Sequence, residues 1–359
     1  MENRKQDIPQ TKQITMKHRI FQFYILTLIC TLSSCKSYET VEDYLDKIYQ
    51  KGELNGNVLV VINGETIYEK SFGFADGSKT TKLNKDYRFI IGSVYKEFPA
   101  VAIMQLQEQG YIHLEDKIVK YLPELPEWSK KVSIKHLLQY SSGLPTVPWD
   151  EYFGKNITIT DEYLFTKVKN IENLQFEPGS DYIYSNNNPI TLMKIVEAVT
   201  NMPFVNYVKE HIFNPFNLNN TVIKDQYPYQ DKKLMAIPFN TSFEEDDYTI
   251  ATKSFLFTST ARDMIDWLEV LGNFEVVSKS SIKTLSEEAK IGDNIQSPLG
   301  RCDWENEKVI EHSHHGSSGN YECVVRRFKQ EGITIVILTN QKHSNVYGIS
   351  NEIYKKIKI

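Results

Sequence analysis

Runs of strand-forming residues at both ends of the 359-residue chain constrain its fold more than any other feature. Near the N-terminus, the apolar run 57–62 is followed by Asn63-Gly64, a strong hairpin-turn signal, and residues 65–72 return as a second strand. Three more strands are expected near the C-terminus, at residues 309–314, 321–328 and 333–339. Helical periodicity dominates the stretch between the two sets. The pattern predicts an α/β (α+β) protein with one antiparallel sheet, built from both chain ends and flanked by helices.

We expect residues of about 40–95 and 272–359 to form the sheet region, and residues of about 96–271 to form a mostly helical inserted domain. Helices are expected at 42–50, 134–140, from about 189, at 204–213, after Thr260 as N-cap, and at 345–359. Ligand clefts often form where two such parts meet, so we expect the active site between them.

The N-terminus has the pattern of a targeting segment. Basic residues 17–19 precede an apolar run, 20–32, which has the length of a signal-peptide core and is short for a membrane span. The run ends in Leu32-Ser33-Ser34-Cys35, which resembles a bacterial lipobox. We therefore expect residues 1–35 to be a signal segment, with Cys35 lipidated and the protein anchored in the bacterial cell envelope, periplasmic or facing the outer membrane. The alternatives are an ordinary cleaved signal and a buried helix.

The net charge limits the kinds of partner that the chain can bind, and the cysteine content limits the disulfides that it can form. The net charge of −5 and the absence of a basic stripe argue against nucleic acid as the main partner. If Cys30 leaves with the signal and Cys35 carries lipid, Cys302 and Cys323 remain. They lie before and after the strand that ends in His314, so they could form a disulfide in an exported protein, or stay as two buried thiols.

The first chemical motif is Ser93-Val94-Tyr95-Lys96, which follows Gly92 and opens a helical pattern. Residues three apart at a helix start share a face, and a buried lysine can act as the base that activates a serine hydroxyl. The helix N-terminus adds a positive dipole beside a developing oxyanion. The spacing alone is weak support, because Ser-x-x-Lys also occurs at Ser33–Lys36 and Ser280–Lys283.

Two later motifs could supply the missing partners. In Tyr184-Ser185-Asn186, the tyrosine could relay protons and the asparagine amide could hold a substrate carbonyl, although the segment also suits a turn and a helix cap. In His314-His315-Gly316-Ser317, the glycine permits close backbone approach, and the N–H that follows it can donate to an oxyanion. The alternatives are a glycine-rich hairpin with surface histidines, or a metal site that includes His312. We expect no metal and no cofactor, because no matching ligand cluster is evident.

The order of these three motifs resembles the serine β-lactamase and penicillin-binding protein superfamily, in particular its class C and esterase-like branch. Framework stretches resemble the same family over nearly everything after Cys35; they include residues 114–123, 136–144, 178–179, 215–221 and 259–263. The resemblance implies the β-lactamase/transpeptidase-like fold and an acyl-enzyme mechanism.

Position by position, the resemblance implies Ser93 as the acylated nucleophile, Lys96 as its base and Tyr184 as the proton shuttle. It implies Asn186, His314, Gly316 and Ser317 as substrate-binding positions, with the backbone N–H groups of Ser93 and Ser317 forming the oxyanion hole. One departure stands out: β-lactamases typically have lysine and then threonine or serine before the glycine, where this chain has two histidines.

These observations predict a lipid-anchored serine hydrolase that acts on a small-molecule or peptide ester or amide. Alternatives are a true β-lactamase or D,D-peptidase, and a non-hydrolytic acyl-binding sensor. Because a neutral histidine supplies no permanent charge for a substrate carboxylate, we expect poor β-lactam turnover and better turnover of small esters or of amides without a free carboxylate.

Overall fold

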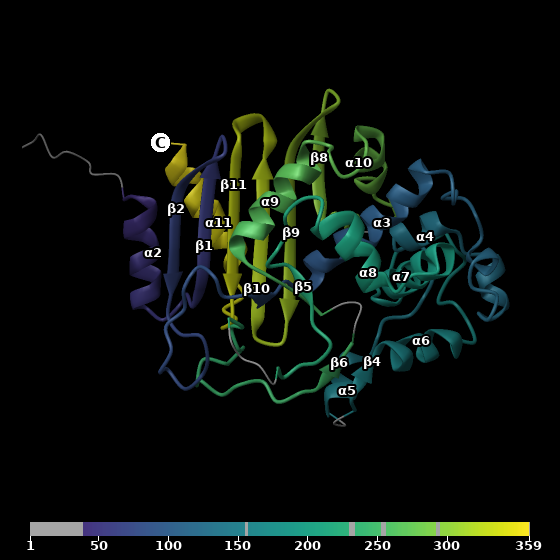
Figure 1. Ribbon diagram of the computed structural model, residues 1–359, viewed down its shortest axis with the longest axis horizontal. Coiled ribbons are helices and arrows are strands. Elements are labelled where there is room, and N and C mark those ends of the chain that lie inside the picture. Colours follow the sequence, from purple (N-terminus) through teal and green to yellow (C-terminus); the bar gives the residue numbers. More distant parts are fainter. Residues whose placement is uncertain (1–38, 155–156, 230–233, 253–255, 292–294, 359) are drawn as a thin grey trace, which may run out of the picture.

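The computed structural model describes residues 39–154, 157–229, 234–252, 256–291 and 295–358. Its six-stranded antiparallel sheet confirms the expected fold class. The strand order is β2-β1-β11-β10-β9-β8, so strands from the two ends of the chain pair in the middle (Figure 1). Their bounds are β1 Gly56–Ile62, β2 Glu65–Phe72, β8 Arg301–Glu305, β9 Lys308–Ser318, β10 Tyr321–Phe328 and β11 Ile333–Thr339.

Both faces of the sheet are covered. Successive side chains of a strand point to opposite faces. Val58 and Val60 of β1 therefore pack with α2 (Val41–Gln50) and α11 (Val346–Ile357), whereas Leu59 and Val61 join the larger core cluster that includes α9 (Ala261–Gly272). Figure 1 shows α9 across one face, with α2 beside the β2 edge. This double cover explains why every residue of β11 is buried.

The helical part contains α3 at its centre. Residues 98–104 of this helix are all buried, as expected for a helix that is apolar on every side. The 3₁₀ turn η1 leads into it, and α8 continues into one π turn, η4. The bounds are η1 Gly92–Lys96, α3 Glu97–Glu108, α4 Ile134–Leu138, α5 Trp149–Gly154, α6 Asp161–Lys169, α7 Asn187–Thr200, α8 Phe204–Val208, η4 Lys209–Phe213 and α10 Lys279–Leu285. Short strands accompany them: β3 Phe89–Ile90, β4 Ile159–Thr160, β5 Val222–Ile223, β6 Ile250–Ala251 and β7 Phe257–Ser259.

Most of the helices and strands expected from the sequence are present in the structure. Thr260 caps α9, as expected, by accepting a hydrogen bond from the backbone N–H of Asp263. Several elements were not predicted, among them the helices α5, α6 and α10 and the strands β4 to β8. β9 also runs four residues beyond the expected end at His314, because residues 316–318 continue to pair with residues 321–323 of β10.

Of the two possibilities for Cys302 and Cys323, the structure contradicts the disulfide. Cys302 is on β8 opposite His312, and Cys323 is on β10 opposite Gly316, so β9 separates them. Both thiols are free. The Cys323 thiol instead donates to the Ile91 carbonyl at 3.1 Å.

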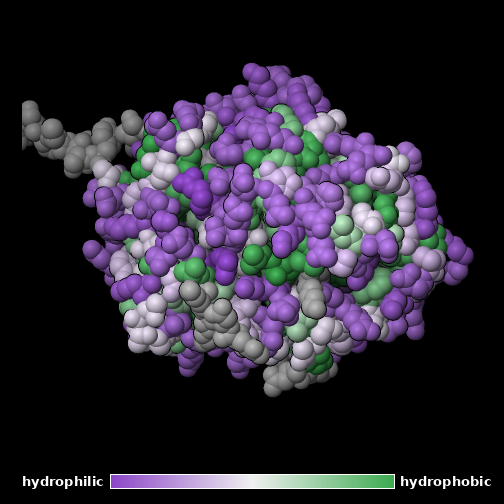
Figure 2. Space-filling model, viewed as in Figure 1, coloured by the Kyte–Doolittle hydropathy of each residue, from purple (hydrophilic) through white to green (hydrophobic). Residues whose placement is uncertain are grey.

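The molecular surface in Figure 2 is mostly hydrophilic, with small apolar patches between polar side chains. Within the described ranges, no helix is both long enough and apolar enough to cross a membrane. The expected signal segment and Cys35 lie outside the described residues. Lipidation therefore remains a prediction.

Candidate active site

Two glycines bring η1 into direct contact with β9. A Cβ atom on Gly316 would lie 2.0 Å from the Ile91 carbonyl oxygen, and one on Gly92 would lie 2.3 Å from the Ser317 nitrogen. Gly92 also has a φ of +49°, which L side chains rarely adopt. The turn that carries Ser93 therefore lies against the backbone of Ser317, and both positions require glycine.

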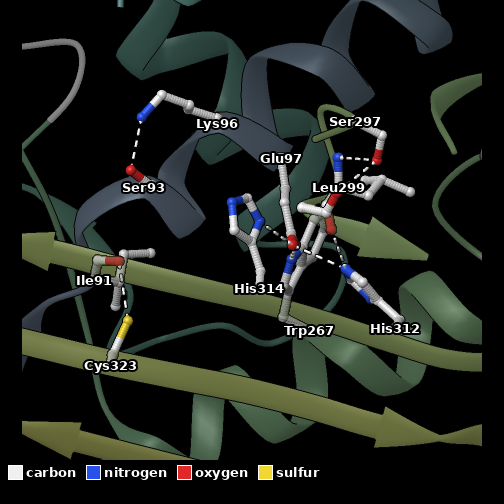
Figure 3. Close-up of polar contacts among 11 residues, drawn as sticks. Ile91, Ser93, Lys96, Glu97, Trp267, Ser297, Leu299, His312, His314 and Cys323 are labelled. Carbon is white, nitrogen blue, oxygen red and sulfur yellow. Dashed lines mark hydrogen bonds and ion pairs between the residues drawn. The ribbon is translucent and has the colours of Figure 1, made fainter. Parts of the chain in front are cut away.

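Ser93 and Lys96 meet within η1. Lys96 Nζ lies 2.9 Å from Ser93 Oγ, and the lysine side chain is buried (Figure 3). The ring centroids of Tyr95 and Tyr184 lie 4.8 and 4.9 Å from the same Nζ. These rings confine the amine to the side of Ser93, where a neutral amine can accept the hydroxyl proton. The expected α-helix begins only at Glu97, so Ser93 sits on a 3₁₀ turn ahead of it.

A cavity of about 240 Å³ opens over Ser93, and we call it the Ser93 cleft. Its lining brings together four of the predicted site residues, Ser93, Lys96, Asn186 and Ser317. The other lining residues are Ile90, Gly92, Tyr95, Trp149, Ile250, Leu256, Ser318, Gly319 and Lys342. The cleft is thus bounded by η1, the end of β9 and the segment before α7.

Hydrogen bonds to the Pro145 carbonyl fix the position of the Tyr184–Asn186 segment. Ser185 Oγ and Asn187 Nδ2 both donate to the Pro145 carbonyl, at 2.5 and 2.8 Å. The Tyr184 ring packs against Tyr140 at 4.9 Å and reaches the cleft through its contact with Lys96. Asn186 Oδ1 accepts from the Tyr95 hydroxyl at 3.3 Å.

Lys342 is a cleft residue that the sequence motifs did not indicate. Its ammonium donates to Ser317 Oγ at 2.8 Å, and no described carboxylate forms an ion pair with it. Lys342 follows β11 and the buried Asn340, which is hydrogen-bonded to Asn55 and to the Ile237 carbonyl. Lys342 therefore brings to this end of the site a positive charge that the sequence motifs did not predict. The charge comes from a loop and not from the third motif.

His314 lies beneath the described lining of the cleft. The residue is 2% exposed, which also excludes the alternative of a surface histidine at this position. Neighbouring His315 points to the opposite face of the sheet, where its Nε2 lies 3.0 Å from Glu322 Oε1. Gly316 acts as the contact point for Ile91, with no side chain to offer a ligand. His314 is thus not among the residues that line the Ser93 cleft, and its predicted role in substrate binding stays a prediction.

Glu97 is a second residue that the motifs missed. Its carboxylate is fully buried beside Lys96 in sequence, and Oε1 lies 2.8 Å from His314 Nδ1 and 3.0 Å from His312 Nε2 (Figure 3). Oε2 accepts from Trp267 Nε1 at 2.6 Å. Burial alone would raise the pKa of Glu97, but the two histidines outweigh it and lower that pKa to about 2. A charged residue at the start of an otherwise apolar helix was the available signal.

The contacts of Glu97, His312 and His314 also bear on the alternative that His312 belongs to a metal site. His312 Nε2 lies 3.0 Å from the Leu299 carbonyl as well as from Glu97, so its nitrogen is used by protein acceptors. In the part of the chain that the structure describes, no group of three or more His, Cys, Asp or Glu residues is arranged to hold a metal ion.

A family model described as Beta-lactamase matches residues 39–357. Penicillin-binding protein 4* of Bacillus subtilis (strain 168) is 24% identical over 337 residues, covering 86% of this chain and 72% of that protein. Protein flp of Staphylococcus aureus (strain MW2) is 25% identical over 321 residues, covering 85% of this chain but 63%, less than two thirds, of that protein.

Solved structures agree on the fold. The penicillin binding protein from Bacillus halodurans superposes with a TM-score of 0.75 at 21% identity, covering 87% of this chain and 98% of that one. The D-amino acid amidase from Ochrobactrum anthropi SV3, complexed with L-phenylalanine amide, gives a TM-score of 0.73 at 18% identity, covering 89% and 97%.

Proposed function

Because the chain belongs to the Beta-lactamase family, we propose that it is a serine hydrolase that cleaves an ester or amide through an acyl-enzyme on Ser93. The observation that carries this proposal is the 2.9 Å contact between Lys96 Nζ and Ser93 Oγ at the floor of a cleft. Two residues, three positions apart within one 3₁₀ turn, thus supply a nucleophile and its base.

The geometry supports a two-step reaction. Lys96 takes the Ser93 proton as Oγ bonds to the substrate carbonyl carbon. The backbone N–H groups of Ser93 and Ser317 donate hydrogen bonds to the negative charge that develops on the carbonyl oxygen. As the bond between the carbonyl carbon and the leaving group breaks, Tyr184, whose ring contacts Lys96, donates its hydroxyl proton to the leaving group and regains one from Lys96. Water then attacks the acyl carbon and gives a proton to Lys96, which passes it to Ser93 Oγ as the bond between Oγ and the acyl carbon breaks.

The cleft walls suggest what the substrate looks like. Trp149, Ile250 and Leu256 offer apolar contact, and Asn186 offers a side-chain amide for a substrate carbonyl. An acyl compound with one apolar group fits this lining. The amidase neighbour acts, by its name, on amides of amino acids, which agrees with this class of substrate.

A second candidate function is favoured by Lys342. Its ammonium at the Ser317 end of the cleft could bind a substrate carboxylate, as a D,D-peptidase or a β-lactam-reactive enzyme requires. The penicillin-binding name of the Bacillus subtilis relative points in the same direction.

Covalent labelling tests the proposal. A fluorescent fluorophosphonate should label the wild type, and Ser93→Ala should abolish labelling. The matched control is Ser280→Ala, because Ser280 has the same spacing to a lysine, but Lys283 pairs with Glu307 on the surface. A fluorescent penicillin, used alongside, reports on the second candidate. Intact-mass analysis locates the adduct: an adduct retained on Ser93→Ala would disprove the assignment, and a burst without turnover would indicate an acyl-binding sensor.

A further inference from the structure

The carboxylate of Glu97 is the most buried charged group near the Ser93 cleft, and the reaction proposed above does not use it. It is 0% exposed and adjoins Lys96 in the chain. Three side-chain donors from distant elements converge on it: Trp267 from α9, and His312 and His314 from β9. A buried charge is retained only where such donors offset its desolvation.

The contacts of Glu97 determine where protons lie on the two histidines. A carboxylate only accepts hydrogen bonds, so His314 Nδ1, 2.8 Å away, must carry a proton. His312 Nε2 lies 3.0 Å from both Glu97 Oε1 and the Leu299 carbonyl, and two acceptors require a proton there too. Burial, the strongest influence, lowers the pKa of His314, so its ring is neutral near pH 7. Its other nitrogen, Nε2, therefore presents a lone pair.

This lone pair is on the catalytic side of the ring. In Figure 3 the His314 imidazole lies between Glu97 and the Ser93–Lys96 pair, and its second nitrogen is on the side away from Glu97. Gly300 holds the ring from behind, because a Cβ there would lie 2.7 Å from His314 Cγ. The ring can thus neither turn nor withdraw from this position without displacing its neighbours.

We propose that Glu97 is a positioning residue: it fixes His314 in the tautomer whose Nε2 lone pair faces Lys96, and this dipole stabilises the ammonium that forms when Lys96 takes the Ser93 proton. The inference rests on the proposed acyl-enzyme function. Its logic is that of a buried carboxylate that orients a histidine in a catalytic triad, with the histidine acting on a lysine and not directly on the serine. No covalent bond to Glu97, His312 or His314 is involved.

The groups that face His314 set the pH range of the effect. They are Lys96 from η1, Glu97 from α3 and His312 from its own strand. The nearby thiols are neutral, because burial raises the pKa of Cys302 to about 11 and that of Cys323 further. Glu97 raises the pKa of His314, and Lys96 and His312 lower it. Removing the Glu97 charge should therefore move the acid limb of the pH–rate profile to lower pH.

The first test measures the tautomer of His314 in the wild-type protein. Imidazole ¹⁵N NMR of the selectively labelled full chain, with His314→Gln used only for assignment, should show His314 neutral with its proton on Nδ1 at pH 7. A proton on Nε2, or an imidazolium, would overturn the proposal. This measurement does not depend on activity, so it stands even if the serine hydrolase proposal fails.

The second test compares Glu97→Gln with Asp263→Asn. An amide cannot accept from Trp267 and from both histidines at once, so the tautomer of His314 is no longer fixed. We expect the rate at which a fluorophosphonate reacts with Ser93 to fall on the order of a hundredfold, and the acid limb to shift as described. Asp263 is another buried carboxylate, with Asn220, Thr221 and Thr260 as donors, and serves as the control for lost stability.

The outcomes separate the two proposals. Acylation of Glu97→Gln at the wild-type rate, or an equal loss in Asp263→Asn, would overturn the positioning role while leaving Ser93 as nucleophile. An unlabelled wild type would instead remove the proposed function, and the ¹⁵N measurement would still report the tautomer.

Discussion

At the scale of single residues, Lys342 changes the expected substrate preference most. We expect Lys342→Gln to lower kcat/KM for a depsipeptide with a free carboxylate on the leaving group by about ten- to a hundredfold, since a charge-assisted hydrogen bond contributes about 1.5–3 kcal/mol. The corresponding amide-capped substrate should be nearly unaffected. Lys355→Gln is the control, because Lys355 is exposed and paired with Glu352 on α11. Equal losses on both substrates would show that Lys342 supports the loop and does not bind substrate.

Also at this scale, Glu97 should make stability depend on pH. Its pKa is about 2 when folded and 4.5 ordinarily, so the unfolded chain binds more protons between these values. The contribution, of order 3 kcal/mol from a shift of about 2.5 units, is present above pH 4.5 and disappears as pH falls toward 2. Urea titrations of wild type and Glu97→Gln should therefore differ most at neutral pH and converge in acid. A difference in the free energy of unfolding between wild type and Glu97→Gln that stays constant with pH would contradict this prediction.

At the scale of elements, the site depends on how closely η1 approaches β9. In Gly316→Ala, the added Cβ would meet the Ile91 carbonyl, so η1 must move away and carry Ser93 from the Ser317 N–H. We expect a loss of about 1–3 kcal/mol in stability and a much larger loss of acylation rate. Gly110→Ala is the control: its φ is +77° with nothing within 4 Å, so it should cost about 1–2 kcal/mol without affecting acylation. Thermal unfolding reports the loss of stability in each variant, and labelling rates report the loss of acylation, so both should be measured for Gly316→Ala and Gly110→Ala.

At the scale of the whole molecule, we propose that the protein is held at a bacterial membrane by lipid on Cys35. The proposal rests on the sequence Leu32-Ser33-Ser34-Cys35 after an apolar run. A single acyl chain binds marginally, whereas two signals or more give stable anchoring. We expect Cys35→Ala to move the protein from the membrane fraction to the soluble fraction of the native host. A variant that stays with the membranes would refute the anchor, and Cys302→Ala provides the control for loss of a thiol.

The sequence by itself determined what short-range geometry controls. The apolar run 57–62 forms β1 as predicted, and the Asn63-Gly64 turn returns the chain as β2. The three-residue spacing of Ser93 and Lys96 lets them meet within one turn. The order of the three motifs predicted the family, and the family match and the fold confirm that prediction. The roles of the individual site residues stay predictions.

Tertiary structure alone decided which distant residues share the site. Glu97 meets His314 across 217 positions of sequence, and Lys342 meets Ser317 only because β11 and β9 flank the same strand. The same strand order keeps Cys302 and Cys323 apart. Neither periodicity nor spacing encodes such contacts, because they depend on sheet order and on glycines that let η1 approach β9. The local pattern supplies a nucleophile and its base, and packing decides what surrounds them.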